Sequence, residues 1–358
     1  MHISDEKMGI KAHERMDDSL RAELVDKASN LSYAKTIENI KNIGIHSRTA
    51  VMKAIREVEA IGNDAAPVKY NNRKVGTLFV EADEDHIAMQ HGNGKMAYIV
   101  YVHEGIERVS KGRNRLLNVR YFTGVKTKNE DLWIQVANYI EEAYDTYAQK
   151  KVYLSGDGAA WIKEGLNWIP KSMFVLDRFH LAKYVKRATA HIPDMHDRMW
   201  KCIDNNKKED AKKLFEEIGK STEKESKRKS VAEVRTYVIG NWEAIQRQYL
   251  EDYIGCSAEG HVSHVLSDRL SSRPMGWSMD GADQIASLRV FKFNGGNVYE
   301  YITNKRKAAE KKARIDKLDS RVIKRSKRNA YETLDNITII NFGKRSWATN
   351  FLKSVRGL

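Results

Sequence analysis

Three acidic residues lie where the expected ends of strands and helices would bring them to one site. Asp83 comes late in the run LFVEADEDHIAMQ, and Asp157 lies between two glycines at the end of the apolar run KVYLSGDG. Glu259 lies much later, in GCSAEGHVSHVLSDRL, near the expected start of a helix. Ligands gather at the carboxyl ends of strands in open α/β sheets. Two carboxylates from separate strands would therefore form a candidate site for a hard divalent cation, with Glu259 as a third acid.

Each acid also has a simpler interpretation when it is taken alone. A solvated turn could account for the run of acids Glu81, Asp83, Glu84 and Asp85. Glu259 alone could be a first-turn helix acid that interacts favourably with the macrodipole. Asp157 is the strongest candidate, because glycines on both sides let the backbone turn and a ligand approach closely.

Two pairs of residues with helical spacing could also carry chemistry. Asp177 and His180 in VLDRFHLAKYV would lie on one face of a helix, where they could brace the site or contact it. Equally, Asp177 could be a helix N-cap followed by a packed histidine. His261 and His264 have similar spacing, but a zinc site is not expected without a cysteine pair or a third spaced histidine.

The elements that would position these residues predict a mixed α/β sheet flanked by helices. Val, Ile, Tyr and Phe are concentrated in three strand-like runs at 75–83, 95–105 and 115–125. A helical period follows in NEDLWIQVANYIEEAYDTYAQ, and the runs KVYLSGDG and SMFVLDRFH then predict two more strands. Strands that alternate with helices after an initial meander indicate this fold class.

The chain before this sheet is expected to be helical and to resemble a helix-turn-helix. Residues 1–62 form this region and 63–74 a linker, with Gly44 in a tight turn and Ser47 capping the second helix. Val51, Ile55 and Val58 would share one buried face. The second helix would present four polar candidates for DNA contact, His46, Arg48, Thr49 and Lys53. An ordinary packed helical hairpin is the equal alternative.

Three further segments complete the expected organisation. Residues 75–180 would form the first part of the core, 181–253 an all-helical insertion, and 254–300 a second part in which Ser257 caps the Glu259 helix. The last region, 301–358, is expected to be a basic helix, either solvated or in contact with phosphates. Its candidate DNA-binding residues are Lys305, Arg306, Lys311, Lys312, Arg321 and Arg325. Trp161, Trp168 and Trp277 are expected to pack in the core or at its edge.

Composition excludes several classes of protein and favours a polyanionic partner. With 62 Lys and Arg against 48 Asp and Glu, the 358-residue chain carries a formal charge of +14, and nucleic acid is the leading candidate partner. Hydrophobic residues at 41% exclude global disorder, and two cysteines exclude a disulfide scaffold or a four-cysteine zinc site. No apolar run is long enough to cross a membrane, so a soluble, cytoplasmic protein is expected.

Together these segments resemble the DDE transposases of bacterial insertion sequences, a group related to the Mutator-like transposases. LFVEADEDHIAMQ, VYLSGDGAAWI, VLDRFHLAKYV and, most specifically, GCSAEGHVSHVLSDRLSSRPMGWS are similar to the ISLre-type transposases, and the resemblance covers essentially the whole chain. It implies a ribonuclease H-like fold in which Asp83, Asp157 and Glu259 hold two Mg²⁺ or Mn²⁺ ions. Asp83 fits the strand phase best as first ligand, followed by Asp85 and then Glu81.

The resemblance also implies an activity and its partners. The protein would cleave phosphodiester bonds and transfer strands on double-stranded DNA, binding element ends and target as a homo-oligomer close to the nucleoid. Family members usually carry a further N-terminal region, so a truncated or domesticated DNA-binding remnant without catalysis is one alternative. A ribonuclease H-like nuclease that cleaves without joining strands is another.

Overall fold

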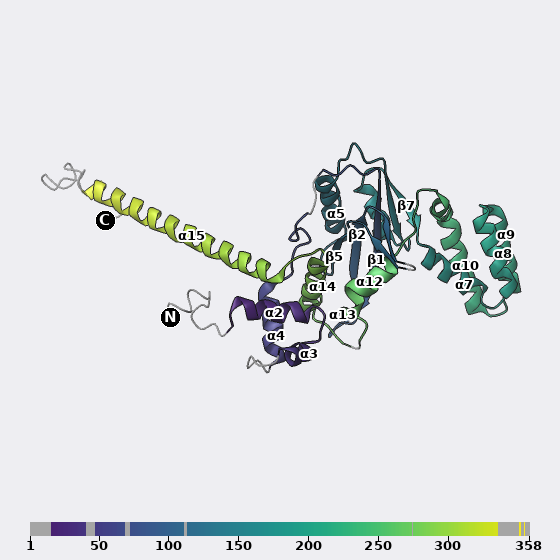
Figure 1. Ribbon diagram of the computed structural model, residues 1–358, viewed down its shortest axis with the longest axis horizontal. Helices are drawn as coiled ribbons and strands as arrows, with labels where there is room; N and C mark the ends of the chain where they lie inside the picture. The colour runs from purple at the N-terminus through teal and green to yellow at the C-terminus, as the bar shows by residue number, and fades with distance from the viewer. Residues whose placement is uncertain are drawn as a thin grey trace. The chain divides into compact units, whose positions relative to one another are not determined.

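The computed structural model describes most of the chain as two compact units. Its described residues are 16–40, 47–68, 72–110, 113–273 and 275–335, together with 351 and 354. The first unit extends to Val298, and the second begins at Tyr299 (Figure 1). None of the described helices has an apolar stretch long enough to span a membrane.

A five-stranded mixed sheet forms the centre of the first unit, as the sequence predicts. Its order is β5-β2-β1-β6-β7. β1 is parallel to β6, and β6 to β7, whereas β2 is antiparallel to both β1 and β5. These strands span Thr77–Ile87 (β1), Lys95–His103 (β2), Arg120–Gly124 (β5), Lys151–Gly156 (β6) and Ser172–Leu176 (β7).

The two faces of β1 have different roles because successive side chains point to opposite sides of a strand. Leu78, Val80 and Ala82 belong to the hydrophobic core that includes residues of helix α5 (Asn129–Ala143). The alternate face carries Glu81, Asp83 and Asp85, and helix α12 (Ala258–Val262) packs against the strand. Both faces are covered, so the three acids are buried.

The third predicted strand, at 115–125, is wrong as a single element. Its first part belongs to a separate hairpin of β3 (Ile106–Ser110) and β4 (Arg113–Leu116), and only its second part forms β5. Asn118 adopts a left-handed conformation with φ of 50°, which turns the chain between the two strands. The Leu117 amide nearby donates to the Gly105 carbonyl.

The segment after β7 contains helices and no strand from residue 178 to 253, all of which the structure describes. Leu181 and Val185 share one hydrophobic core with Val234 and Val238 and with the sheet, so the insertion is packed onto the central core. Its helices are α7 (Arg178–Thr189), α8 (Pro193–Asp204), α9 (Lys208–Ser221), α10 (Glu225–Gly240) and α11 (Trp242–Gln246), followed by a 3-10 turn at Arg247–Tyr249.

The N-terminal region forms three helices, α2 (Asp18–Ala28), α3 (Tyr33–Asn39) and α4 (Arg48–Val58). As predicted, the Ser47 side chain accepts a hydrogen bond from the Thr49 amide at the start of α4. The face predicted for α4 is also buried. The predicted turn with Gly44, and the DNA-contact candidate His46, lie outside the described residues.

The segment expected as a linker, 63–74, is instead attached to the sheet where the structure describes it. The Asn63 side chain donates to the Thr123 carbonyl at 2.9 Å and accepts from the Thr123 amide at 3.0 Å, as a neighbouring strand would. Residues before and after it belong to one compact unit. An asparagine can replace a strand partner in this way, which composition alone does not reveal.

The chain after the insertion is helical. α12 continues into a π-helical turn (Ser263–Ser267) and α13 (Asp268–Leu270), and α14 (Met279–Phe293) follows. α15 (Val298–Asp335) contains the basic stretch, and its described side chains from residue 307 to 329 are exposed.

Candidate active site

Strand register brings three acids to one level at the carboxyl edge of the sheet. Glu81 pairs with Ser155 in the parallel β1–β6 ladder, so two residues further along Asp83 is level with Asp157. Gly156 pairs with Leu176 in the β6–β7 ladder, so one residue further along Asp157 is level with Asp177. Continued past the last paired residues, this register sets Asp83 beside Asp157, with Asp177 on the far side of Asp157.

Glycine is required at two positions around Asp157. A Cβ atom at Gly156 would lie 2.8 Å from the Ala82 carbonyl oxygen, so a side chain there would push β6 away from β1. Gly158 has a φ of +91°, which residues with a side chain rarely adopt. The Tyr237 hydroxyl of α10 donates to the Asp157 carbonyl at 2.6 Å. Tyr237 supports the turn from the distant insertion, and no motif in the sequence signals this contact.

The environment of Asp83 links it to the other two acids of the predicted triad. Asp83 is 7% exposed, and burial raises the pKa of its carboxyl to about 7. The Glu84 amide and the charge of His180 oppose this rise, whereas the negative charges of Glu259 and Asp157 contribute to it. The charges of Asp157 and Glu259 thus act on the Asp83 carboxyl.

Glu259 lies in the first turn of α12, as predicted, but Ser257 holds this helix differently from the expected cap. Ser257 occupies the N-cap position without a capping hydrogen bond from its side chain. Its backbone amide instead donates to Glu81 Oε2 at 2.6 Å. The Glu81 carboxylate of β1 therefore holds the N-cap residue of the Glu259 helix through that residue's own amide.

Glu81 is a buried anchor in a closed hydrogen-bond network. Its side chain is 2% exposed and accepts hydrogen bonds from Tyr101 at 2.5 Å and from Ser257, with His103 Nε2 at 2.9 Å. Burial acts to raise the pKa of Glu81, but the interactions with His103, Tyr101 and Ser257 outweigh it and lower the pKa. These partners occupy the carboxylate, which argues for a structural role.

Asp85, the other alternative first ligand, holds a different segment. The Ser271 hydroxyl donates to Asp85 Oδ1 at 2.7 Å, so the side chain ties the chain after α13 to the end of β1. Burial raises the pKa of Asp85, and hydrogen bonds from serine hydroxyls oppose that rise.

Asp177 is both a helix N-cap and the partner of His180, the two roles that the sequence leaves open. Asp177 caps α7 by accepting from the Phe179 amide at 3.2 Å, and its other oxygen lies 2.8 Å from His180 Nδ1. This hydrogen bond raises the pKa of His180, and the charges of Asp83, Asp177 and Asp157 raise it further. A protonated His180 would offset part of the negative charge at this edge.

The chemistry of the acids fits a divalent cation. Three carboxylates supply hard oxygen ligands, and the pKa of Asp83 is raised mainly by burial and also by the charges of Glu259 and Asp157, which a cation would offset. In the described part of the chain, however, no three His, Cys, Asp or Glu side chains are already grouped as a ligand set. The donors match such an ion in charge and type without forming a closed cage.

Replacing Asp83 by Asn is expected to stabilise the protein in a pH-dependent manner. The pKa of Asp83 is about 7 when folded and 3.8 ordinarily, so between these values the unfolded chain releases a proton that the folded protein retains. Wild-type stability therefore falls as pH rises through this window, whereas asparagine cannot ionise. Asp83→Asn should melt above the wild type at pH 8, by about 2–4 °C per kcal/mol gained.

The comparison at pH 4 is the control, because folded Asp83 is then protonated and the unfolded carboxyl is only partly ionised, so the two proteins should melt at nearly the same temperature. Mg²⁺ should raise the melting temperature of the wild type at pH 8 more than that of the variant. A difference in melting temperature that is the same at both pH values would contradict the assignment of a buried, repelled carboxylate.

The basic residues predicted to contact DNA lie on two helices. Arg48, Thr49 and Lys53 are exposed on α4. The C-terminal candidates lie on α15 in the second unit, where Arg306 is half-buried and Lys305, Lys311, Lys312, Arg321 and Arg325 are exposed.

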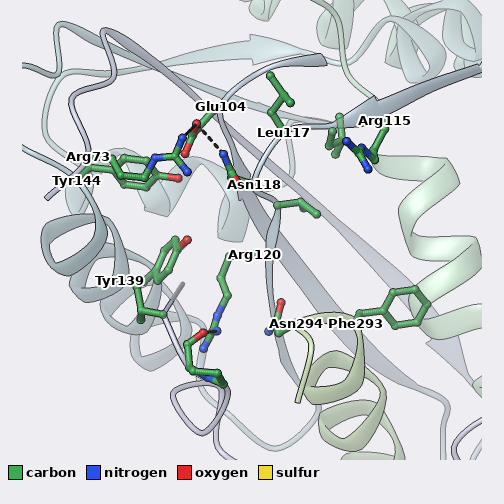
Figure 2. Close-up of a pocket in the computed structure, with 14 residues that line it drawn as sticks. Arg73, Glu104, Arg115, Leu117, Asn118, Arg120, Tyr139, Tyr144, Phe293 and Asn294 are labelled. Carbon is green, nitrogen blue, oxygen red and sulfur yellow. Dashed lines mark hydrogen bonds and ion pairs between the residues drawn. The ribbon is translucent and has the colours of Figure 1, made fainter. Parts of the chain in front are cut away.

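A cavity of about 320 Å³ lies away from these acids, beside the start of β5 (Figure 2). Glu104 accepts hydrogen bonds there from Arg73 at 2.8 Å and from Asn118 at 3.0 Å, drawn as dashed lines in Figure 2. Arg120 donates to the carbonyls of Asn63 and Pro67. None of the predicted site residues lines this cavity.

Comparison with known proteins identifies relatives along nearly the whole chain. A family model described as uncharacterised protein family UPF0236 matches residues 1–307. A UPF0236 protein of Caldanaerobacter subterraneus subsp. tengcongensis is 42% identical over 346 residues, which cover 96% of this chain and 73% of that protein. The UPF0236 protein in the vanSb 3′ region of Streptococcus gallolyticus is 23% identical, over 81% of this chain and 67% of that protein.

Among solved structures, the Drosophila P element transposase strand transfer complex aligns with 84% of each chain, at 10% identity and a TM-score of 0.32.

Proposed function

The chain belongs to the uncharacterised family UPF0236, and from that premise we propose that it is a DNA transposase of the ISLre type with a ribonuclease H-like core. The observation that carries this proposal is the alignment of Asp83 with Asp157 at the carboxyl edge of the sheet, where the charge of Glu259 also acts on Asp83. A mixed sheet with its acids on the central strand and the adjacent strand supports the proposed fold.

The proposed reaction is phosphodiester cleavage followed by strand transfer. Asp83, Asp157 and Glu259 would hold two Mg²⁺ or Mn²⁺ ions, which supply charge stabilisation for an in-line displacement at phosphorus. Asp85 remains the alternative first ligand. Water is the first nucleophile and a DNA 3′-hydroxyl the second, so the protein needs no nucleophilic side chain. His180, held by Asp177, would balance negative charge beside the scissile phosphate.

DNA binding would use the exposed basic residues outside the sheet. Lys and Arg contacts with phosphates supply affinity without reading sequence, and a helix in the major groove can read it. We propose that α4 contacts the element ends through Arg48, Thr49 and Lys53, that α15 contacts phosphates, and that the protein acts as a homo-oligomer in the bacterial cytoplasm.

A strand-transfer assay tests the proposed activity. Purified protein is incubated with labelled element ends and target DNA, in parallel with Mg²⁺ and with EDTA. Joined products that appear only with Mg²⁺ support a transposase. Cleavage without joining would favour the ribonuclease H-like nuclease, and binding without cleavage in Mg²⁺ would favour a DNA-binding remnant.

Neutralising the basic residues of α15 is expected to weaken DNA binding and flatten its salt dependence. Every phosphate that is no longer neutralised should reduce the slope of log K against log salt concentration by about 0.9. The variant replaces Lys305, Arg306, Lys311, Lys312, Arg321 and Arg325 by Gln, and filter binding over a salt series measures the slope. A matched variant that exchanges Lys and Arg at the same positions keeps the charge and should keep the slope. Equal slopes for the Gln variant and the wild type would exclude a role of these residues in phosphate binding.

A further inference from the structure

A second cavity, of about 310 Å³, lies close to the carboxyl end of β1 in the first unit. Trp277 is joined to the chain just after this strand by two hydrogen bonds, from its amide to the Ala88 carbonyl and from the Gln90 amide to its own carbonyl, each of 2.9 Å. Gln90 and Trp277 both line the cavity. The cavity is therefore lined by the chain that leaves β1, seven residues after Asp83.

A buried arginine without an acidic partner forms one wall of this cavity. Arg269 is 4% exposed, and in the described part of the chain no carboxylate forms an ion pair with it. Its guanidinium lies between two rings, 4.8 Å from the centre of Trp277 and 5.6 Å from that of Tyr33. It donates hydrogen bonds to the Ala28 carbonyl and to the Met275 sulfur. A buried charge normally has a counter-ion, so Arg269 is suited to an anionic ligand.

The surroundings of Arg269 add positive charge. Burial lowers the pKa of Arg269 to about 10; Tyr33 opposes this shift, and the charges of Arg289 and Arg273 contribute to it. Arg56 of α4 lines the same cavity, and its charge acts together with that of Arg269 on the Tyr33 hydroxyl. The described residues that line this cavity include two arginines and no acid.

The remaining walls suit a planar group with polar edges. Met52 and Met275 supply apolar surface, and the amides of Gln90 and Gln284 can donate and accept hydrogen bonds. The side-chain oxygen of Gln284 is buried and has no hydrogen-bond partner among the described residues. Proteins that take a base out of a DNA stack hold it between apolar side chains and read its edge with such groups.

We propose that this cavity binds one unpaired nucleotide of the DNA strand on which the protein acts, with the phosphate at Arg269 and Arg56 and the base between Met52 and Met275. The proposal rests on the proposed function, since it assigns part of that DNA substrate. Helix α4 connects this cavity to the proposed DNA-binding surface. Met52 and Arg56 of this helix line the cavity. The exposed residues of the same helix are Arg48, Thr49 and Lys53. The proposed nucleotide site also gives a role to Met275, Gly276 and Trp277, which line the cavity.

The test compares two labelled duplexes that differ by one unpaired nucleotide, with fluorescence anisotropy in EDTA so that no strand is cut. Wild-type protein should bind the duplex with the unpaired nucleotide about 5- to 100-fold more tightly, the range expected for one base stacked on a protein. Arg269→Gln removes the charge, and Met52→Trp fills the cavity while leaving Arg269 in place. Both variants should lose this preference and keep their affinity for the fully paired duplex.

Arg115→Gln is the matched control, because Arg115 is an exposed arginine of β4 that pairs with Glu107 outside this cavity. It should keep the preference. Met52→Trp keeps the test valid if Arg269→Gln fails to fold, as judged by circular dichroism. Equal wild-type affinity for the two duplexes, or an unchanged preference in folded Met52→Trp, would overturn the proposal.

The two proposals fail in different ways. If wild-type protein cuts and joins DNA in Mg²⁺ without preferring the unpaired nucleotide, the cavity assignment is wrong and the proposed function stands. If the preference is present and no strand is cut in Mg²⁺, the catalytic assignment is wrong and the nucleotide site stands.

Discussion

Asp157→Asn should abolish most strand cleavage while duplex binding persists. The change removes one negative ligand and preserves the size of the side chain. Ligands of catalytic ions stabilise transition-state charge by several kcal/mol, so the cleavage rate should fall about 10²- to 10³-fold. DNA affinity should stay the same or rise, because a carboxylate that repels phosphate has become neutral. A Mg²⁺-dependent cleavage assay and a filter-binding titration measure the two effects on the same preparation.

A matched control separates the loss of this ligand from a general change of charge. Asp210→Asn makes the same replacement at an exposed position of α9 and should cleave at the wild-type rate. The Asp157→Asn side chain can still accept from the Ala159 amide, as the carboxylate does at 2.8 Å, so the turn should be preserved. Cleavage by Asp157→Asn at the wild-type rate would exclude Asp157 as a metal ligand.

Glu81→Ala should destabilise the fold by about 3–5 kcal/mol, because it removes a buried acceptor of several hydrogen bonds and each buried donor left unsatisfied costs about 1–3 kcal/mol. The variant leaves His103 buried without its acid and removes the acceptor of the Tyr101 hydroxyl. It also releases the Ser257 amide at the start of the Glu259 helix. Denaturant unfolding measures the loss, and Glu141→Ala, an exposed position of α5, should change stability by less than about 0.5 kcal/mol.

The effect of Glu81→Ala should also depend on pH. The folded pKa of Glu81 lies below its ordinary 4.5, so its contribution is present above that value and is lost as pH falls through the folded pKa. Wild type and variant should therefore converge in stability in strong acid. A variant as stable as the wild type at pH 7 would show that Glu81 does not anchor α12, and would reopen its candidacy as a metal ligand.

The strands and acids that can be predicted from the sequence are those whose signal is local. An apolar run that ends in Gly156, Asp157 and Gly158 specifies both a buried strand and the turn after it. The helix of Glu259 is predicted for the same reason, from residues within one turn. Strand 115–125 is mispredicted because a single left-handed residue, Asn118, interrupts a continuous β-forming composition.

The division of roles among Glu81, Asp83 and Asp85 could not be predicted from the sequence. All three occupy alternate positions on one face of β1, so periodicity treats them alike. They differ in partners that are distant along the chain: Ser257 for Glu81 and Ser271 for Asp85. The sequence likewise does not predict that Arg269 is buried without an acid beside it in the described part of the chain. Which residues surround Arg269 depends on the three-dimensional packing.

Strand pairing that aligns acids at one edge of the sheet affects how the sequences of related proteins can diverge. The acids concerned here are Asp83, Asp157 and Asp177. The paired strands that lead to these acids set their spacing, and the connections between the strands do not. Loops and helices between the acids can therefore lengthen or shrink over evolution while the separation of the carboxylates is conserved. The number of residues between two acids is then a poor guide to kinship, and the phase of each acid relative to its strand is a better one.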